Sequence, residues 1–103
     1  MEPQFEGTEI KLGGQSYTLP PLSLGQIKRL RPKLEGMREN PESAIDTMAE
    51  AIHMALSRNY PEMTREQVED MVDAGNVLPL FRAVVTVSGM ELRAPGGEKA
   101  GSE

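Results

Sequence analysis

The chain of 103 residues contains no cysteine and no long apolar run. Without cysteine it has neither a disulfide framework nor a thiolate nucleophile, so nothing marks it as a small secreted scaffold and an intracellular location is the default. Its first residues have no basic region followed by an apolar run, and no segment approaches the roughly 20 apolar residues that span a bilayer. We therefore expect a protein that is neither exported nor membrane-spanning.

The chain also has fewer basic than acidic residues. Eleven Lys and Arg stand against sixteen Asp and Glu, which gives a formal net charge of -5. Affinity for a phosphate backbone comes largely from Lys and Arg, so we expect no nucleic-acid partner. The hydrophobic share of 38% supports one modest core, and the length leaves room for one domain.

Residues that carry out catalysis or bind metals are equally scarce. The single histidine, His53, falls on the flank of a predicted helix, and no second ligand or nucleophile is spaced to join it. Glu66, Asp70 and Asp73 recur at helical spacing, but such a row is ordinarily the solvated face of an amphipathic helix. The sequence has no Gly-rich phosphate loop, zinc spacing or serine elbow. We predict that the protein is not an enzyme and has no catalytic residue, metal or cofactor.

The N-terminal part of the sequence predicts a β-hairpin. Two segments with alternating apolar residues, 8–12 and 15–19, flank Gly13 and Gly14, which tolerate the positive φ angles of a tight two-residue turn. An isolated two-stranded hairpin is marginal in water. Its apolar face must therefore pack on the helices that follow.

A first helix is predicted to begin after Ser23, because Gln26 three residues later completes a capping box. Pro32 lies inside the apolar stripe of this helix, where it removes a backbone donor and clashes with the preceding turn. We expect a kink or a break at Pro32 and an end near Gly36.

Three more helices are predicted downstream. Asn40 as the N-cap, with a proline after it, starts a central helix that ends near Asn59. A capping box begins a third helix, expected over about residues 64–74, and Asn76 caps a fourth. Residues 83–87 are rich in β-branched side chains, so a strand is the alternative to the end of that fourth helix.

Together these elements predict an α+β fold, mostly α, in which an N-terminal hairpin packs on a bundle of about four helices. We expect one domain over residues 1–89 and a disordered C-terminal tail over 90–103, which is too poor in apolar residues to offset the entropy of ordering it. The predicted core residues are Leu12, Leu19, Ile27, Leu30, Ile45, Ile52, Val68, Phe81 and Val84.

Seven methionines, against two tyrosines and two phenylalanines, favour a surface that adapts to protein partners. Most of these methionines fall on stripes that are predicted to be buried. Met54 faces away from the apolar side of the central helix, and Met37 lies beyond the predicted kink. We predict these two as partner-binding residues.

Two stretches of the sequence together resemble a known family. They are Leu12-Gly13-Gly14 followed by Tyr17-Thr18-Leu19-Pro20-Pro21-Leu22, and Ala55-Leu56-Ser57-Arg58-Asn59-Tyr60-Pro61-Glu62-Met63-Thr64 followed by an acidic helix and Asn76. In this order, over about residues 8–89, they are similar to the small tail assembly chaperones of long-tailed bacteriophages and prophages.

The resemblance implies a protein without catalytic residues that acts in the cytoplasm of the bacterial host and is absent from the mature virion. Such a protein binds the tape measure protein, keeps its apolar helices from aggregating and helps to recruit tail tube subunits. In many members of the family, a programmed frameshift adds a second domain. Self-association and the identity of the client surface are left open.

The residues are also compatible with two other functions. A generic adaptor would share the acidic, methionine-rich character of the chain. A regulatory helix-turn-helix module is the second alternative, because a short helix, a turn at Gly75 and another helix follow one another. The helix after that turn carries only Arg82 as a basic residue before Gly89, which argues against DNA binding.

Overall fold

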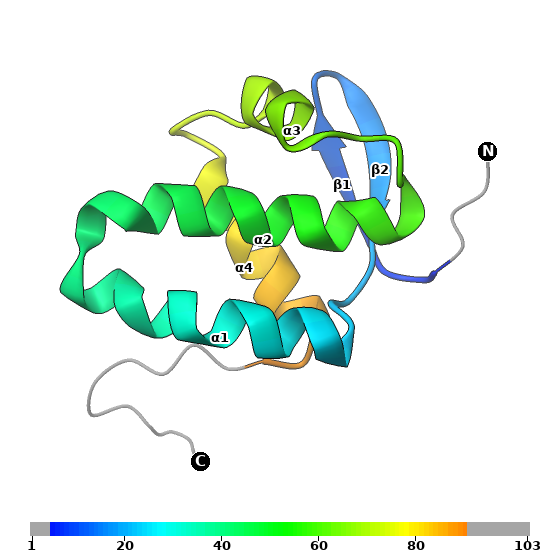
Figure 1. The fold of residues 1–103 in the computed structure, drawn as a ribbon. Helices are drawn as coiled ribbons and strands as arrows, with labels where there is room; N and C mark the ends of the chain where they lie inside the picture. Colours follow the sequence, from blue (N-terminus) through cyan, green and yellow to red (C-terminus); the bar gives the residue numbers. More distant parts are fainter. Residues whose placement is uncertain (1–4, 91–103) are drawn as a thin grey trace, which may run out of the picture.

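The computed structural model describes residues 5–90, and Figure 1 follows them from the hairpin to the last helix. Their elements are β1 (Thr8–Leu12), β2 (Gln15–Leu19), α1 (Leu24–Glu39), the 3-10 turn η1 (Pro41–Ser43), α2 (Ala44–Asn59), α3 (Arg65–Met71) and α4 (Val77–Val87). Within this part of the chain, an antiparallel hairpin precedes four α-helices, so the predicted α+β, mostly α fold is confirmed. The predicted tail over 90–103 lies, apart from Met90, outside the described residues.

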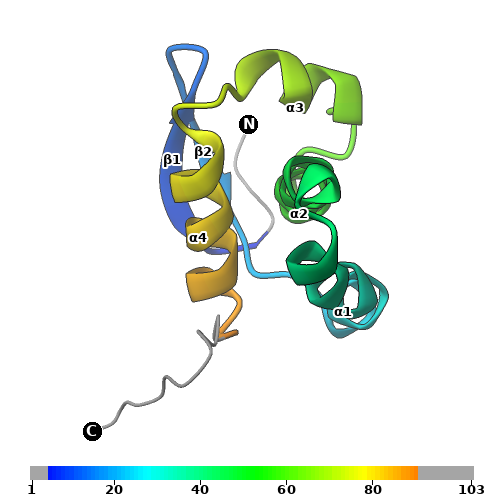
Figure 2. The same cartoon turned by 90° about the vertical axis from the view of Figure 1, so that its left-hand side faces the viewer.

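The hairpin forms in the predicted register. Leu12 lies opposite Gln15, and Gly13 and Gly14 make the turn with φ angles of 57° and 83°. Ile10 and Leu12 are buried, because the hairpin packs against α4 and α2. In Figure 2 the hairpin and α4 lie together on one side of the molecule, and α2 and α1 follow on the other.

Both predicted capping boxes are present. Ser23 Oγ accepts a hydrogen bond from the Gln26 amide at 3.1 Å, and Gln26 Oε1 accepts one from the Ser23 amide at 3.0 Å. Thr64 and Gln67 repeat this exchange at the start of α3, at 3.1 and 2.8 Å. Each box satisfies two backbone donors that a helix start otherwise leaves unpaired.

Of the kink or break expected at Pro32, the break does not occur, and the expected end near Gly36 is wrong, because α1 continues through the proline to Glu39. Leu30, before the proline, is buried, and Leu34, after it, packs against the core. Burial on both sides of Pro32 outweighs the one hydrogen bond that the proline removes.

α2 is the central helix, since it contacts α1, α3, α4 and the hairpin. The Asn40 side chain accepts from the Glu42 amide at 3.2 Å, so it caps η1, and α2 itself begins at Ala44. The buried residues of α2 are Thr47, Met48, Ala49, Ala51, Ile52, Ala55, Leu56 and Asn59.

The third helix is shorter than predicted. α3 ends at Met71 rather than near residue 74, and Asp73 with Asn76 folds the following segment into a turn. Side chains of Asp and Asn compete in this way with the helical backbone for its own amides.

Residues 83–87 are helical, which decides between the two alternatives for this segment. In α4, Phe81, Val84 and Val85 are buried on one side of the helix. The packing of these side chains on α2 and the hairpin outweighs the strand propensity of the valines.

Seven of the nine predicted core residues are buried, namely Leu12, Leu19, Leu30, Ile52, Val68, Phe81 and Val84. Ile27 is partly buried and packs against them. Ile45 is the one clear error, because its side chain is 62% exposed. It lies in the first turn of α2.

The last residues of α2 fasten the hairpin to the helices. Asn59, only 5% exposed, accepts a hydrogen bond from the Phe5 amide at 2.7 Å. Its own amide group donates to the carbonyls of Phe5 at 2.9 Å and of Thr18 at 3.1 Å. One side chain therefore pairs three backbone groups from two different segments.

Residues on either side of Asn59 complete this attachment. Tyr60 Oη accepts from the Thr18 amide at 2.8 Å, and its ring meets that of Tyr17 edge to face at 5.2 Å. Arg58 Nη1 donates to the Pro21 carbonyl at 2.6 Å. We call Arg58, Asn59 and Tyr60, with these contacts, the hairpin joint.

Ile52→Ala should lower the free energy of unfolding by about 2 to 5 kcal/mol, because it leaves a cavity in the centre of the core. Ile45→Ala, on the same helix, should change it by less than about 0.5 kcal/mol, since that side chain is exposed. Urea denaturation followed by circular dichroism measures both. Equal losses at the two isoleucines would contradict the burial described above.

Asn59→Leu keeps the approximate shape of the side chain but leaves partly buried backbone groups of Phe5 and Thr18 without their partner. We expect it to lower the free energy of unfolding by about 3 kcal/mol. The same substitution at the exposed Asn40 should cost at most about 1 kcal/mol, through a lost cap. A loss at Asn59 no larger than at Asn40 would show that the hairpin joint contributes little to stability.

Candidate functional site

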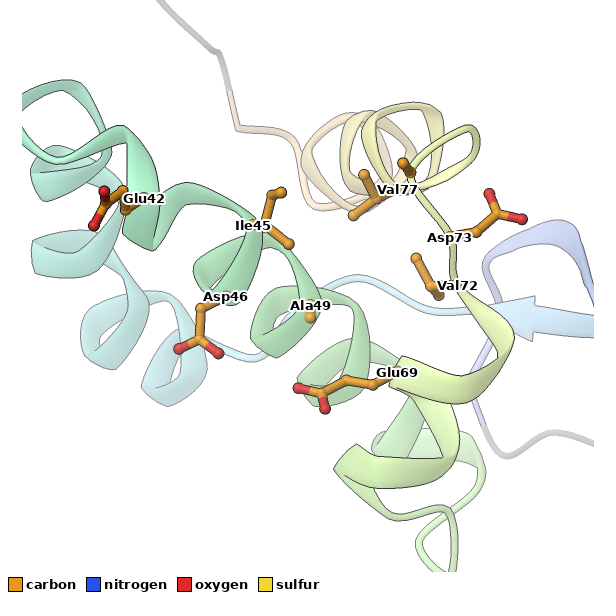
Figure 3. A pocket seen from close by; sticks show the side chains of 9 residues that line it. Glu42, Ile45, Asp46, Ala49, Glu69, Val72, Asp73 and Val77 are labelled. Carbon is orange, nitrogen blue, oxygen red and sulfur yellow. The ribbon is translucent and has the colours of Figure 1, made fainter.

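A groove of about 540 Å³ opens between the start of α2 and the segment that joins α3 to α4. Its apolar lining comprises Ile45, Ala49, Val72, Ala74 and Val77, and its acidic lining comprises Glu42, Asp46, Glu69 and Asp73. Figure 3 shows the labelled apolar side chains between the two walls, with the carboxylates around them. We call this surface the Ile45 groove.

Ile45 is the residue that distinguishes this groove. The chain leaves 62% of an isoleucine exposed there, next to Ala49 and Val77, which are themselves buried. Complete burial of an isoleucine side chain contributes roughly 1.5 to 3 kcal/mol, and at 62% exposure Ile45 forgoes more than half of that energy. A ligand that covers Ile45 would recover part of that energy.

The second wall of the groove is set by the turn after α3. Asp73 Oδ1 accepts from the amides of Gly75 at 2.9 Å and Asn76 at 3.0 Å, and Asn76 Oδ1 accepts from the Asp73 amide at 2.8 Å. This reciprocal arrangement fixes the turn and places Val72 and Val77 on either side of it. Because α3 ends at Met71, the segment after it forms a turn, and this turn is one wall of the groove.

Charge in the groove is predominantly negative. Arg65 Nη2 pairs with Asp46 Oδ1 at 2.6 Å, and Arg65 Nε pairs with Glu69 Oε2 at 3.0 Å, which ties α3 to α2. One guanidinium thus offsets only part of the charge of the four lining carboxylates. The groove suits a ligand that combines an apolar group with a Lys or Arg nearby.

The two predicted partner-binding residues are not brought together. Met37 and Met54 are both partly buried and pack against the core, so the expectation that they lie outside it is corrected. Gln26 Nε2 donates to the Met54 carbonyl at 2.9 Å, which places Met54 beside the first turn of α1. Met37 lies eleven positions after Gln26, about 16 Å farther along that helix. Their role in binding stays a prediction.

His53 has a structural contact. Its Nε2 lies 3.0 Å from the carbonyl oxygen of Met63. Since a carbonyl only accepts, Nε2 is the donor, and the bond ties α2 to the loop before α3.

The acidic row predicted on the third helix is broken up. Asp73 lies beyond the end of α3 at Met71, so it does not share a helix face with Glu66 and Asp70. In the part of the chain that the structure describes, no group of three His, Asp or Glu residues could hold a metal ion.

Two smaller hollows lack a comparable exposed side chain. One, of about 460 Å³, lies beside Tyr17 and Tyr60, and the other, of about 390 Å³, lies between Thr8 and the C-terminal half of α4. The large exposed apolar side chains among residues 5–90 are Leu24, Ile45 and Leu78, and of these Ile45 lines the groove.

The groove was not predicted from the sequence, because Ile45 continues the helical period of the core residues after it. One local signal was present: Ile45 stands between Glu42 and Asp46, in the first turn after a proline-initiated start. An apolar residue flanked by carboxylates at a helix start is poorly placed for a core.

Among residues 5–90, no helix combines the length and the apolar character that crossing a membrane requires. Comparison with protein-family models, with curated proteins and with solved structures gives no match to this chain.

Proposed function

We propose that this protein is a non-catalytic assembly chaperone that binds an apolar segment of a client protein in the Ile45 groove. The observation that carries the proposal is the isoleucine, 62% exposed, on an apolar surface between two walls. Exposed apolar patches rimmed by polar groups are typical of protein-binding sites. A small domain retains such a patch at the expense of its own stability.

The lining of the groove also favours a client segment of a particular composition. Its acidic residues favour a segment in which Lys or Arg flanks the apolar side chains. An amphipathic helix meets this requirement, because residues at i and i+4 lie on one face and can combine an apolar anchor with a cation. The anchor would cover Ile45, and the cation would face Glu42 or Asp46.

The resemblance to tail assembly chaperones supplies the proposed client, the tape measure protein, and the proposed recruits, the tail tube subunits. Support for the resemblance comes from the hairpin joint. Tyr17 and Thr18 belong to the first resembling stretch, Asn59 and Tyr60 belong to the second, and these residues contact one another. The two stretches therefore form one structural unit, which gives a physical reason for their occurring together.

DNA binding as a helix-turn-helix module has less support. α4, which follows the turn, has Arg82 as its one basic residue and buries Val77, Phe81 and Val84 against the rest of the domain. The groove beside this turn is acidic, so it would repel phosphate. A generic adaptor would use the same groove but would bind a client other than the tape measure protein.

Co-expression tests the proposal. The chain should keep a co-expressed tape measure protein soluble and retain it in a pull-down at about 0.5 M salt, because burial of apolar surface is screened little by ions. Ile45→Glu should reduce the retained client at least about tenfold, since it removes the apolar anchor point and adds a fifth carboxylate. Leu24→Glu is the matched control. It also replaces an exposed apolar residue by glutamate, since Leu24 is 75% exposed, but it lies at the start of α1, near the C-terminal half of α2.

Full retention of the client by Ile45→Glu would place the client elsewhere on the molecule. Loss of the client with both variants would point to a general effect of added negative charge.

The identity of the client is tested separately by the genes beside this one. We expect a tail tube gene and a very long tape measure gene there. An isolated metabolic operon would contradict the phage assignment.

A further inference from the structure

The first two turns of α1 carry a surface whose chemistry is opposite to that of the Ile45 groove. Leu24 is 75% exposed, the largest exposure among the big apolar side chains of residues 5–90. Lys28 and Arg31 follow at i+4 and i+7, so they share a face with Leu24, and both are exposed. Neither makes an ion pair within the described residues. We call these three residues the Leu24 face.

We propose that the Leu24 face of one copy of this chain docks in the Ile45 groove of a second copy. Leu24 is the apolar group that would cover Ile45, and Lys28 and Arg31 are the cations that the acidic lining favours. The inference rests on the exposure and charge of these two surfaces and not on the identity or existence of a client.

The two surfaces cannot meet within one copy. Gln26, two residues after Leu24, bonds to the Met54 carbonyl, whereas Ile45 lies nine positions before Met54, about 14 Å away along α2. Since α1 and α2 pack side by side along this length, Leu24 is held away from the groove of its own chain.

The rest of the chain offers a poorer occupant. Residues 91–103 contain three glutamates against one arginine and one lysine, so that segment lacks the positive charge that the groove favours. Leu92 stands between Glu91 and Arg93, without a second cation at helical spacing before Lys99. The charge pattern thus favours a second copy over the chain's own C-terminal segment.

Docking of two different surfaces has a defined consequence for assembly. In a pair of copies, the first contributes its Leu24 face and the second contributes its Ile45 groove. The groove of the first copy and the Leu24 face of the second copy remain free to bind further copies. Such heterologous contacts extend into rings or open chains rather than stopping at a symmetric dimer. The contact is small, so association is expected to be weak and to require high protein concentration.

Sedimentation equilibrium of the whole chain, up to about 500 μM, tests this inference. The average mass should rise above 11.3 kDa with concentration and pass the mass of a dimer. The rise should be smaller at about 1 M than at about 0.1 M salt, because the Debye length falls from about 10 Å to about 3 Å. Ile45→Glu and Leu24→Glu should each remain monomeric while keeping the wild-type circular dichroism spectrum.

Mixing the two variants gives the decisive result. Ile45→Glu retains an intact Leu24 face and Leu24→Glu retains an intact groove, so an equimolar mixture should form a complex of one copy of each and nothing larger. Arg29→Glu is the control, because it adds the same charge change on another side of α1 and should associate as the wild type does.

A wild-type chain that stays monomeric throughout this range, or a variant mixture that stays monomeric, overturns the inference. So does association that stops at a dimer and survives in both single variants. If the chain self-associates but does not retain the tape measure protein, the self-association is supported and the proposed function is rejected. If a strictly monomeric chain retains the client, the proposed function is supported and the self-association is rejected.

Discussion

The buried amide of Asn59 is the contact on which the arrangement of this domain depends. A two-stranded hairpin has little stability of its own, and here it is held at the C-terminal end of α2 by the three hydrogen bonds that Asn59 makes to Phe5 and Thr18. A buried amide must find such partners, so this position of the hairpin is favoured over others. Tyr60 and Arg58 reinforce it.

The hairpin is held at the C-terminal end of α2, and Ile45 lies at the opposite end of the same helix. The hairpin and α4 cover the middle and end of α2, while α3 stops at Met71 and continues as a turn. In the first turn of α2, Asp46 pairs with Arg65 of α3, but Ile45 beside it remains 62% exposed. If the groove accepts both a client segment and the Leu24 face, the two occupants exclude each other.

Local features of the structure could be predicted from the sequence, and features that depend on distant contacts could not. The Gly13-Gly14 turn and the Ser23 and Thr64 capping boxes involve residues within three positions of one another, and all were predicted. The continuity of α1 through Pro32 depends on packing against the core, and the exposure of Ile45 depends on where α3 ends. The hydrogen bonds of Asn59 join positions 41 and 54 residues apart, so no local pattern indicates them.

Hydrogen exchange can show whether the client binds in the Ile45 groove. Amide exchange would be followed by mass spectrometry in the Leu24→Glu chain, with and without bound tape measure protein, so that self-association does not contribute. We expect slower exchange over residues 41–49 and 72–77, which form the two walls of the groove, and unchanged exchange in the hairpin over 8–19. Protection confined to the hairpin, or to the neighbourhoods of Met37 and Met54, would contradict this expectation.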